Sequence, residues 1–273
     1  MSSAAGAVQA PKAPRGRRTF TRKQRIIATV INLAIFAAVW ETVATVGEIP
    51  RIFLPKLSEI FQAYPEMIQD GVFFENVWIS LRIYLIGMAL SIAIGVPLGL
   101  IVGGIKILDR ILLPYLWVIY TTPLIILMPL ILLWVGINDT ARVVLIVVSA
   151  VPAIVVIVME GVKTVDASLL RAARSFGAGR GVLFAKVIMP STIPFIATGV
   201  KMGVSRGLIG LFVGELFTAA TGIGHVITLA SKVFDIPRVF AMLLMFVVFS
   251  VAMVGLAQYI ERRLSVWRSS AAL

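Results

Sequence analysis

The 273 residues are 59% hydrophobic and 14% charged, with a mean hydropathy of +1.00. Soluble domains average roughly 45–50% apolar and ~25% charged residues, so this composition excludes an ordinary soluble domain and indicates an integral membrane protein. The net charge of +12 is compatible with nucleic-acid binding, but seven of the 25 Lys and Arg lie between Lys12 and Arg25, just before the first apolar run. That position is typical of a cytoplasmic anchor facing anionic lipid, and no nucleic-acid partner is expected.

The N-terminal residues 1–25 are rich in Ala, Pro, Ser, Lys and Arg. They hold too little apolar surface to fold, which predicts a disordered basic cytoplasmic tail. The next run, Ile26–Trp40, has the length of a signal-peptide core. Glu41 interrupts it and no small-x-small cleavage site follows, which favours an uncleaved first membrane helix.

Six apolar runs are long enough to cross ~30 Å of hydrocarbon, which takes about 20 helical residues. They lie near 26–46, 77–104, 111–136, 141–160, 193–220 and 238–260. The tail, the 105–110 turn, the 163–190 loop and the C-terminal end are all basic, which places them in the cytoplasm. We expect an all-α integral membrane protein with six transmembrane helices over 26–265, a cytoplasmic C-terminal tail over 266–273, and both termini in the cytoplasm.

On the opposite side, the acidic segment 47–76 contains "LPKLSEIFQAYPEMIQDG". Apolar residues recur there at helical spacing and predict a short amphipathic element at the outer interface. Two interpretations stay open, a surface helix packed on the bundle and a docking element for a partner.

Small residues recur every four positions in the second and fifth spans. Such stripes let helix backbones approach closely, because lipid supplies no hydrophobic force for helix association. The residues assigned to helix packing are Gly95, Gly99, Gly103, Gly199, Gly203 and Gly207.

The third span contains "YTTPLIILMP", in which Pro123 and Pro129 remove backbone donors and favour a kink. Carbonyl groups freed at membrane depth are tolerated only against protein or a water-filled cavity. This predicts an interior span with Thr122 on the translocation pathway, and a kink used only for packing is the alternative.

The loop 163–190 contains "RAARSFGAGRGVLFAKVIMP" after "KTVDASLL". Asp166 is placed to cap a helix, and Gly177 falls where a left-handed helix end requires glycine. A second helical piece, Arg180–Lys186, then leads to Pro190 and the fifth span. The sequence predicts a stiff cytoplasmic connection that can transmit force from a soluble partner.

Charged residues inside the fifth span are expensive and usually pair, snorkel or line a pathway. Arg206 and Glu215 are predicted either on a hydrated translocation pathway, where Arg206 favours an anionic solute, or in pairs with neighbouring helices or a second subunit. Lys201 is expected to reach the cytoplasmic surface, and Glu160 and Lys163 to form a local ion pair. The single histidine, His225, lacks clustered ligands, so no metal site and no catalytic residue are predicted.

In the loop 163–190 the chain resembles a known family. The spacing of Ala172, Ala173, Gly177 and Pro190 is similar to the cytoplasmic "EAA" loop of permease subunits in binding-protein-dependent ABC importers. That pattern runs E-A-A, three residues, G, nine residues, I-x-L-P. Arg171 stands at the Glu position, so this contact departs from the family pattern or is matched by a complementary change on the partner.

Other segments are similar to the nitrate, sulfonate and taurine branch of this family. They are "LPKLSEIF", "GVPLGLIVG", "PLILLWVGI", "GVKTVD" and "TGIGHVITLASKVFDIPRVFA", and the resemblance covers roughly residues 50 to 265. It implies a type I ABC importer permease fold, with the 163–190 loop seated in a groove of an ATPase. The coupling residues it implies are Asp166, Leu170, Arg171, Ala172, Ala173, Arg174, Gly177 and Pro190.

The resemblance also implies the partners. These are a second permease copy, two ABC ATPase subunits that bind ATP and Mg, and an external solute-binding protein, assembled in the bacterial inner membrane. Independently, no lysine in the chain follows a glycine, so the G-x-x-x-x-G-K-[ST] phosphate cradle is absent, and no enzyme activity or cofactor is expected in this chain.

The expected function is inward transport of a small, anionic, sulfonate-, taurine- or nitrate-like solute, driven by ATP hydrolysis in partner subunits. A self-sufficient secondary carrier or channel is the alternative, and it predicts inverted repeats with matched broken helices, which the two halves do not display. A membrane scaffold without transport explains the charges inside the spans poorly.

Overall fold

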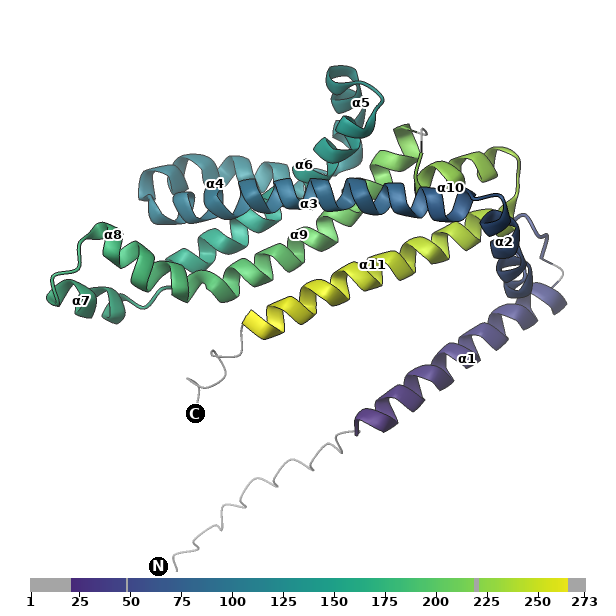
Figure 1. The fold of residues 1–273 in the computed structure, drawn as a ribbon, viewed down its shortest axis with the longest axis horizontal. Helices are drawn as coiled ribbons and strands as arrows, with labels where there is room; N and C mark the ends of the chain where they lie inside the picture. The colour runs from purple at the N-terminus through teal and green to yellow at the C-terminus, as the bar shows by residue number, and fades with distance from the viewer. Residues whose placement is uncertain (1–20, 48, 219–220, 265–273) are drawn as a thin grey trace, which may run out of the picture. The chain divides into compact units, whose positions relative to one another are not determined.

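The computed structural model describes residues 21–47, 49–218 and 221–264, and all regular elements in these ranges are helices (Figure 1). The chain divides into two units, of which the first ends at Ile49 and the second begins at Pro50. Residues 1–20 of the predicted N-terminal tail and the predicted C-terminal tail, 266–273, lie outside the described residues.

The first unit contains one helix, α1 (Arg22–Val46), whose apolar part, Ile26–Val46, matches the first predicted span. The last four residues of the predicted disordered tail, 22–25, belong to this helix. The reason is a capping box, in which the Thr21 hydroxyl accepts from the Gln24 amide and the Gln24 side chain accepts from the Thr21 amide. Hydropathy does not register such a cap, so the prediction was wrong for the last residues of the tail.

The second unit is built around four long apolar helices. They are α3 (Val72–Gly104), α6 (Asp139–Lys163), α9 (Met189–Thr218) and α11 (Ile236–Leu264). Each is long and apolar enough to cross a membrane, and each matches a predicted span within a few residues at either end. The second unit is therefore a helical membrane bundle, as predicted.

The centre of this bundle is α6, which packs against α3 on one side and α9 on the other. Glycines permit the close approach: a Cβ added at Gly99 would lie 2.7 Å from the Val158 Cβ, and one at Gly203 would lie 2.6 Å from the Ile154 Cγ1. The predicted packing glycines that approach α6 are Gly95, Gly99 and Gly103 from α3 and Gly199, Gly203 and Gly207 from α9, and Gly207 also meets Met88 of α3.

The third predicted span, 111–136, is not one helix. It consists of α4 (Lys106–Thr121) and α5 (Leu124–Val135), bent by 102°. The break falls at Pro123, because a residue before proline avoids the helical region and Thr122 is extended, with ψ 126°. Counting this pair as one span gives six, the predicted number.

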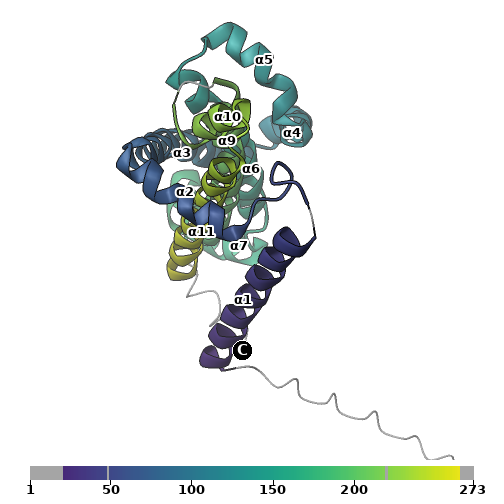
Figure 2. The same cartoon turned by 90° about the vertical axis from the view of Figure 1, so that its right-hand side faces the viewer.

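The prediction that the third span is interior was wrong for α4, which has no buried residue. α5 packs on α6 and α9, on the side of α9 away from α11 (Figures 1 and 2). Pro123 and Pro129 therefore predicted a bend in this span correctly, but they did not predict that α4 has no buried residue.

Two short helices lie at one end of the second unit, α2 (Leu57–Gln69) and α10 (Ile223–Lys232) (Figure 1). α2 is the predicted amphipathic element and packs against α11, where the Tyr64 hydroxyl donates to the Ala241 carbonyl at 2.7 Å. Burial of this phenol raises the pKa of Tyr64. These contacts favour the interpretation of α2 as a helix packed on the bundle.

The opposite end of the second unit contains α7 (Ala167–Ser175), α8 (Arg180–Leu183) and a π-helical turn, η1 (Phe184–Ile188) (Figure 1). η1 continues directly into α9, whose first turn contains Pro190. The loop 163–190 is thus mostly helical and joins α6 to α9.

Candidate functional site

Both ends of α7 are fixed by local chemistry, as the sequence predicts. The Asp166 carboxylate accepts a hydrogen bond from the Ser168 amide at 2.7 Å, and this bond lowers the pKa of Asp166. At the other end Gly177 has φ +79°, the left-handed conformation that favours glycine. The helix is therefore a capped, defined element at the end of the bundle.

The surface of α7 exposes apolar side chains. Phe176 is 92% exposed and Leu169 is 52% exposed, beside the exposed cations Arg171 and Arg174. A large aromatic side chain left this open in a folded chain is typical of a surface that contacts another molecule. The remaining predicted coupling residues lie on the same segment: Leu170 and Ala173 are half-buried, Ala172 is exposed, and Pro190 is half-buried in α9.

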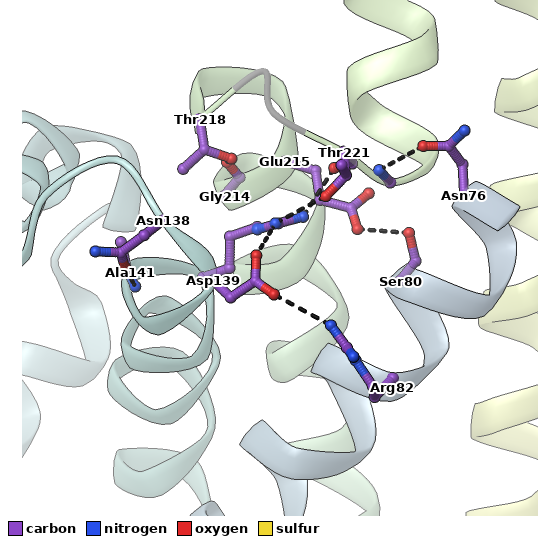
Figure 3. A network of polar contacts seen from close by, with 12 residues as sticks. Asn76, Ser80, Arg82, Asn138, Asp139, Ala141, Gly214, Glu215, Thr218 and Thr221 are labelled. Atoms are coloured by element: carbon purple, nitrogen blue, oxygen red, sulfur yellow. Dashed lines mark hydrogen bonds and ion pairs between the residues drawn. The ribbon is translucent and has the colours of Figure 1, made fainter.

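A polar network lies at the other end of the bundle, around the start of α10 (Figure 3). Glu215 of α9 is fully buried, accepts from the Ser80 hydroxyl, and accepts from the Gly224 amide at 2.8 Å. The Ile223 amide donates to the Ser80 hydroxyl at 2.9 Å, and the Gly222 amide donates to the Asn76 side chain at 2.8 Å. Side chains of α3 and α9 thus satisfy the free amides at the start of α10.

These contacts decide between the two interpretations of Glu215. Both of its oxygens are engaged by protein donors, and no part of the residue is exposed. The structure therefore favours pairing with neighbouring helices over a place on a hydrated pathway. The sequence suggested both alternatives but not the partners, which lie far away along the chain.

A buried arginine that was not predicted from the sequence completes the network. Arg142 of α6 is fully buried, donates to the Thr221 carbonyl at 2.8 Å and to the Thr221 hydroxyl at 3.0 Å, and pairs with Asp139. Asp139 also pairs with Arg82 of α3 at 3.3 Å (Figure 3). The available signal was a charge at the edge of the fourth predicted span, three residues after an acid.

The other two predicted pathway residues come together elsewhere. Arg206 of α9 stacks its guanidinium over the Tyr120 ring, 4.8 Å from the ring centroid. Thr122 lies in the break between α4 and α5, and its hydroxyl donates to the Val118 carbonyl at 2.6 Å. Both residues line one cavity of about 400 Å³, and Glu215 is not among its lining residues.

Two lysines of the membrane-spanning helices form ion pairs between helices. The Lys201 ammonium bonds the Glu261 carboxylate of α11 at 2.7 Å, a pair that the sequence did not predict, and the Lys201 side chain is 27% exposed. The predicted Glu160–Lys163 pair is present at 3.6 Å, but the Lys163 ammonium lies closer to Asp109 of α4, at 2.7 Å. A helix-to-helix ion pair of this kind depends on tertiary contact, which local spacing does not reveal.

No cluster of three or more His, Cys, Asp or Glu with metal-binding geometry occurs within the ranges that the structure describes. The imidazole Nδ1 of His225 is buried without a hydrogen-bond partner in those ranges. A single unpaired nitrogen is insufficient for a metal centre.

The apolar bundle, with the polar network at one end and the capped helical loop at the other, defines a multi-pass α-helical membrane protein. Residues 95–266 match the model of the family described as binding-protein-dependent transport system inner membrane component, and the chain belongs to that family. It is thus a permease component of ABC importers and not an enzyme, because the ATPase of these importers is a separate subunit.

Several named proteins are similar over most of their length. A probable ABC transporter permease protein of Brucella abortus is 28% identical over 250 residues, covering 90% of this chain and 99% of the relative. A Bacillus subtilis permease named for aliphatic sulfonates transport is 28% identical, covering 87% and 86%. The taurine transport system permease protein of Escherichia coli K12 is 26% identical, covering 89% and 90%.

Solved structures support the fold. The inward-facing MetNI methionine ABC transporter contains a chain that aligns with a TM-score of 0.61 at 19% identity, covering 74% of this chain and 98% of that one. An amino acid ABC transporter aligns with a TM-score of 0.58 at 21% identity, covering 73% and 98%. The predicted type I importer permease fold is confirmed at the level of architecture.

Proposed function

We propose that this chain is the membrane subunit through which partner ATPase subunits drive the inward transport of a small anionic solute. Two copies form the pathway, an external solute-binding protein delivers the solute, and ATP and Mg are bound by the ATPase subunits. The α7 end faces the cytoplasm, as do both termini. Membership of the importer family and the exposed, capped α7 support this proposal.

The single observation that carries the coupling role is the mechanical continuity of the loop. α7 is fixed by Asp166 and Gly177, and α8 and η1 run without a break into α9. A push on α7 is passed through the four residues 176–179 to α8, from which a continuous helical segment leads into a membrane helix. A flexible loop would dissipate the same displacement.

The exposed face of α7 suits a groove on a partner. Phe176 and Leu169 supply apolar contact area, and Arg171 and Arg174 supply positive charge. Because Arg171 stands where the family motif has an acid, we expect an acidic or neutral residue opposite it on the ATPase. The coupling roles of Asp166, Leu170, Ala172, Ala173 and Pro190 are part of the same proposal.

The class of solute is proposed from the relatives and from charge. Two of the similar proteins are named for taurine and for aliphatic sulfonates, and both names denote compounds with a sulfonate group. Arg206 places a cation near the middle of α9. A small anion is the solute that this charge favours.

The coupling role is tested by Gly177→Val. A β-branched residue at φ +79° is strongly strained, although open space surrounds the position, so the change distorts the end of α7 without a clash. We expect ATP-driven uptake by the whole transporter to fall ~10-fold or more while the transporter still assembles. Gly181→Val is the matched control, because Gly181 also has open space but lies in α8 without a positive φ.

Unchanged uptake in Gly177→Val contradicts the coupling role of the loop. Gradient-driven transport by the chain alone, with no ATPase bound after mild detergent extraction, contradicts the whole proposal and favours a secondary carrier.

A further inference from the structure

A cavity lies beside Arg206 in the second unit. Its walls come from the break between α4 and α5, from α6 and from α9. Arg206 and Ser149 lie near the middle of α9 and α6, respectively. Its volume of about 400 Å³ falls within the roughly 300–1,000 Å³ typical of small-molecule sites.

Among the described charged residues of α6 and α9, Arg206 is the one that no ion pair or hydrogen bond balances. Lys201 has Glu261, Arg142 has Asp139, and both oxygens of Glu215 are engaged by donors. The Arg206 guanidinium stacks on the ring of Tyr120. No carboxylate of the described residues lies within ion-pair distance of it. A cation at membrane depth without a counter-ion is costly, so a bound anion stabilises this arrangement.

A hydroxyl group in the same cavity also lacks a partner. The Ser149 oxygen is buried and has no hydrogen bond among the described residues. A Cβ added at Gly210, four residues after Arg206, would lie 2.8 Å from it, so this glycine leaves room for the hydroxyl. Buried polar groups normally find partners, and Ser149 lines the same cavity as Arg206, so a small shift of its hydroxyl would offer a donor to a bound anion.

The other walls select among anions. The threonine hydroxyls at 121 and 122 already donate to backbone carbonyls of α4, and the remaining lining residues are Ile, Leu, Val, Pro and Tyr. Among the described residues that line the cavity there is no carboxylate. An ammonium group on the solute would therefore lose its water without gaining a counter-ion, which is unfavourable.

We propose that this cavity is a solute site of the permease itself, in which Arg206 and Ser149 bind the head of a small organic monoanion and apolar walls hold its body. The site prefers such a monoanion to a zwitterion with the same head. The inference rests on the proposed function, because the imported solute is its occupant.

The test measures binding to the permease–ATPase complex in lipid nanodiscs without the external binding protein. The probes are 1-butanesulfonate and taurine, which share a sulfonate head and differ in net charge. We expect saturable calorimetric binding of butanesulfonate, at least ~10-fold tighter than taurine. Arg206→Gln should weaken it ~10–100-fold and Ser149→Ala ~3–10-fold, the usual range for bonds to a charged group.

Two further variants separate binding from folding. Arg206→Lys keeps the positive charge, so its affinity for butanesulfonate should lie between those of wild type and Arg206→Gln. If Arg206→Gln does not assemble, Arg206→Lys and Ser149→Ala are the variants that test the proposal. Arg82→Gln removes an arginine outside the cavity and should bind butanesulfonate as wild type does.

The outcomes distinguish the two proposals. If wild type imports solute with ATP but does not bind butanesulfonate in nanodiscs, or binds taurine as tightly, the cavity assignment is overturned and the proposed function stands. Undiminished binding in both Arg206→Gln and Ser149→Ala also overturns the assignment. Absence of ATP-driven uptake by the wild-type transporter overturns the proposed function instead.

Discussion

At the scale of single residues, the sequence identified charged groups inside the membrane but not their partners. Glu215 was flagged by its position in an apolar run, yet its partners, Ser80 and Gly224, belong to α3 and α10. Arg142 was missed because it lies at the edge of a run. Pairing between distant helices depends on tertiary packing, which a single sequence does not encode as a local pattern.

Removing the Glu215 carboxylate should destabilise the protein. Glu215→Ala leaves the Ser80 hydroxyl and the Gly224 amide buried without their acceptor, and each such group costs about 1–3 kcal/mol. We expect the free energy of unfolding in mild detergent to fall by about 2 kcal/mol or more. Glu75→Ala, at an exposed position of α3, is the control and should change it little. Equal stability of the two variants would contradict the network.

The cap of α7 should respond to pH. The folded-state pKa of Asp166 is lowered from 3.8, so its stabilising effect is present above that value and is lost as the pH falls through the folded pKa. Hydrogen-exchange protection of the Ser168 and Leu170 amides, which donate to Asp166, should hold from pH 7 to about pH 5 and decrease only in stronger acid once corrected for intrinsic rates. Asp166→Asn caps equally well without titrating, so its α7 should keep protection in acid. The same acid-induced loss in that variant would exclude the Asp166 carboxylate as the cause.

At the scale of elements, hydropathy located the long helices well. The sequence predicted that α3, α6, α9 and α11 exist and are helices, because a helix needs about 20 apolar residues to cross the bilayer. Hydropathy did not predict where the helices begin or bend, because caps and prolines determine those positions. The Thr21–Gln24 box extended α1 backwards, and the 102° bend at Pro123 divided a run that composition alone presents as continuous.

The contact between α3 and α6 should be sensitive to a single methyl group. Gly99→Ala places a Cβ 2.7 Å from the Val158 Cβ and 3.0 Å from the Val155 carbonyl, and overpacking of this kind costs about 1–3 kcal/mol. A melting-temperature measurement should show a clear decrease. Gly104→Ala, on the same helix with nothing within 4 Å, should leave the melting temperature nearly unchanged. If Gly104→Ala were the more damaging change, the packing would be wrong.

The bend between α4 and α5 should depend on Pro123. The chain contains no cysteine, so spin labels can be attached at Ile107→Cys and Leu133→Cys, whose native side chains are 69% and 79% exposed. Pro123→Ala restores a backbone donor and relaxes Thr122, so the label distance should lengthen toward the about 39 Å of a continuous helix. An unchanged distance would assign the bend to packing against α6 and α9.

At the scale of the whole molecule, one loop indicated the function. Composition and charge alternation predicted a six-span membrane protein, and the family match confirms a permease. The spacing of Ala172, Ala173, Gly177 and Pro190 supplied the resemblance, because a coupling motif is local in sequence. The cavity beside Arg206 was less predictable, since three separate stretches of the chain, 119–127, 148–152 and 206–213, form its lining.

The central claim is that α7 lies in the cytoplasm and is gripped by the ATPase. Because the chain has no cysteine, a single Phe176→Cys reports on that surface, and Val233→Cys, 74% exposed at the opposite end, reports on the other. Modification by a membrane-impermeant maleimide in sealed vesicles of each orientation is the most direct measurement. We expect Phe176→Cys to react only from the cytoplasmic side and to be protected when the ATPase binds, whereas Val233→Cys should react only from outside. Reaction of Phe176→Cys from outside, or at a rate unaffected by the ATPase, would contradict the central claim.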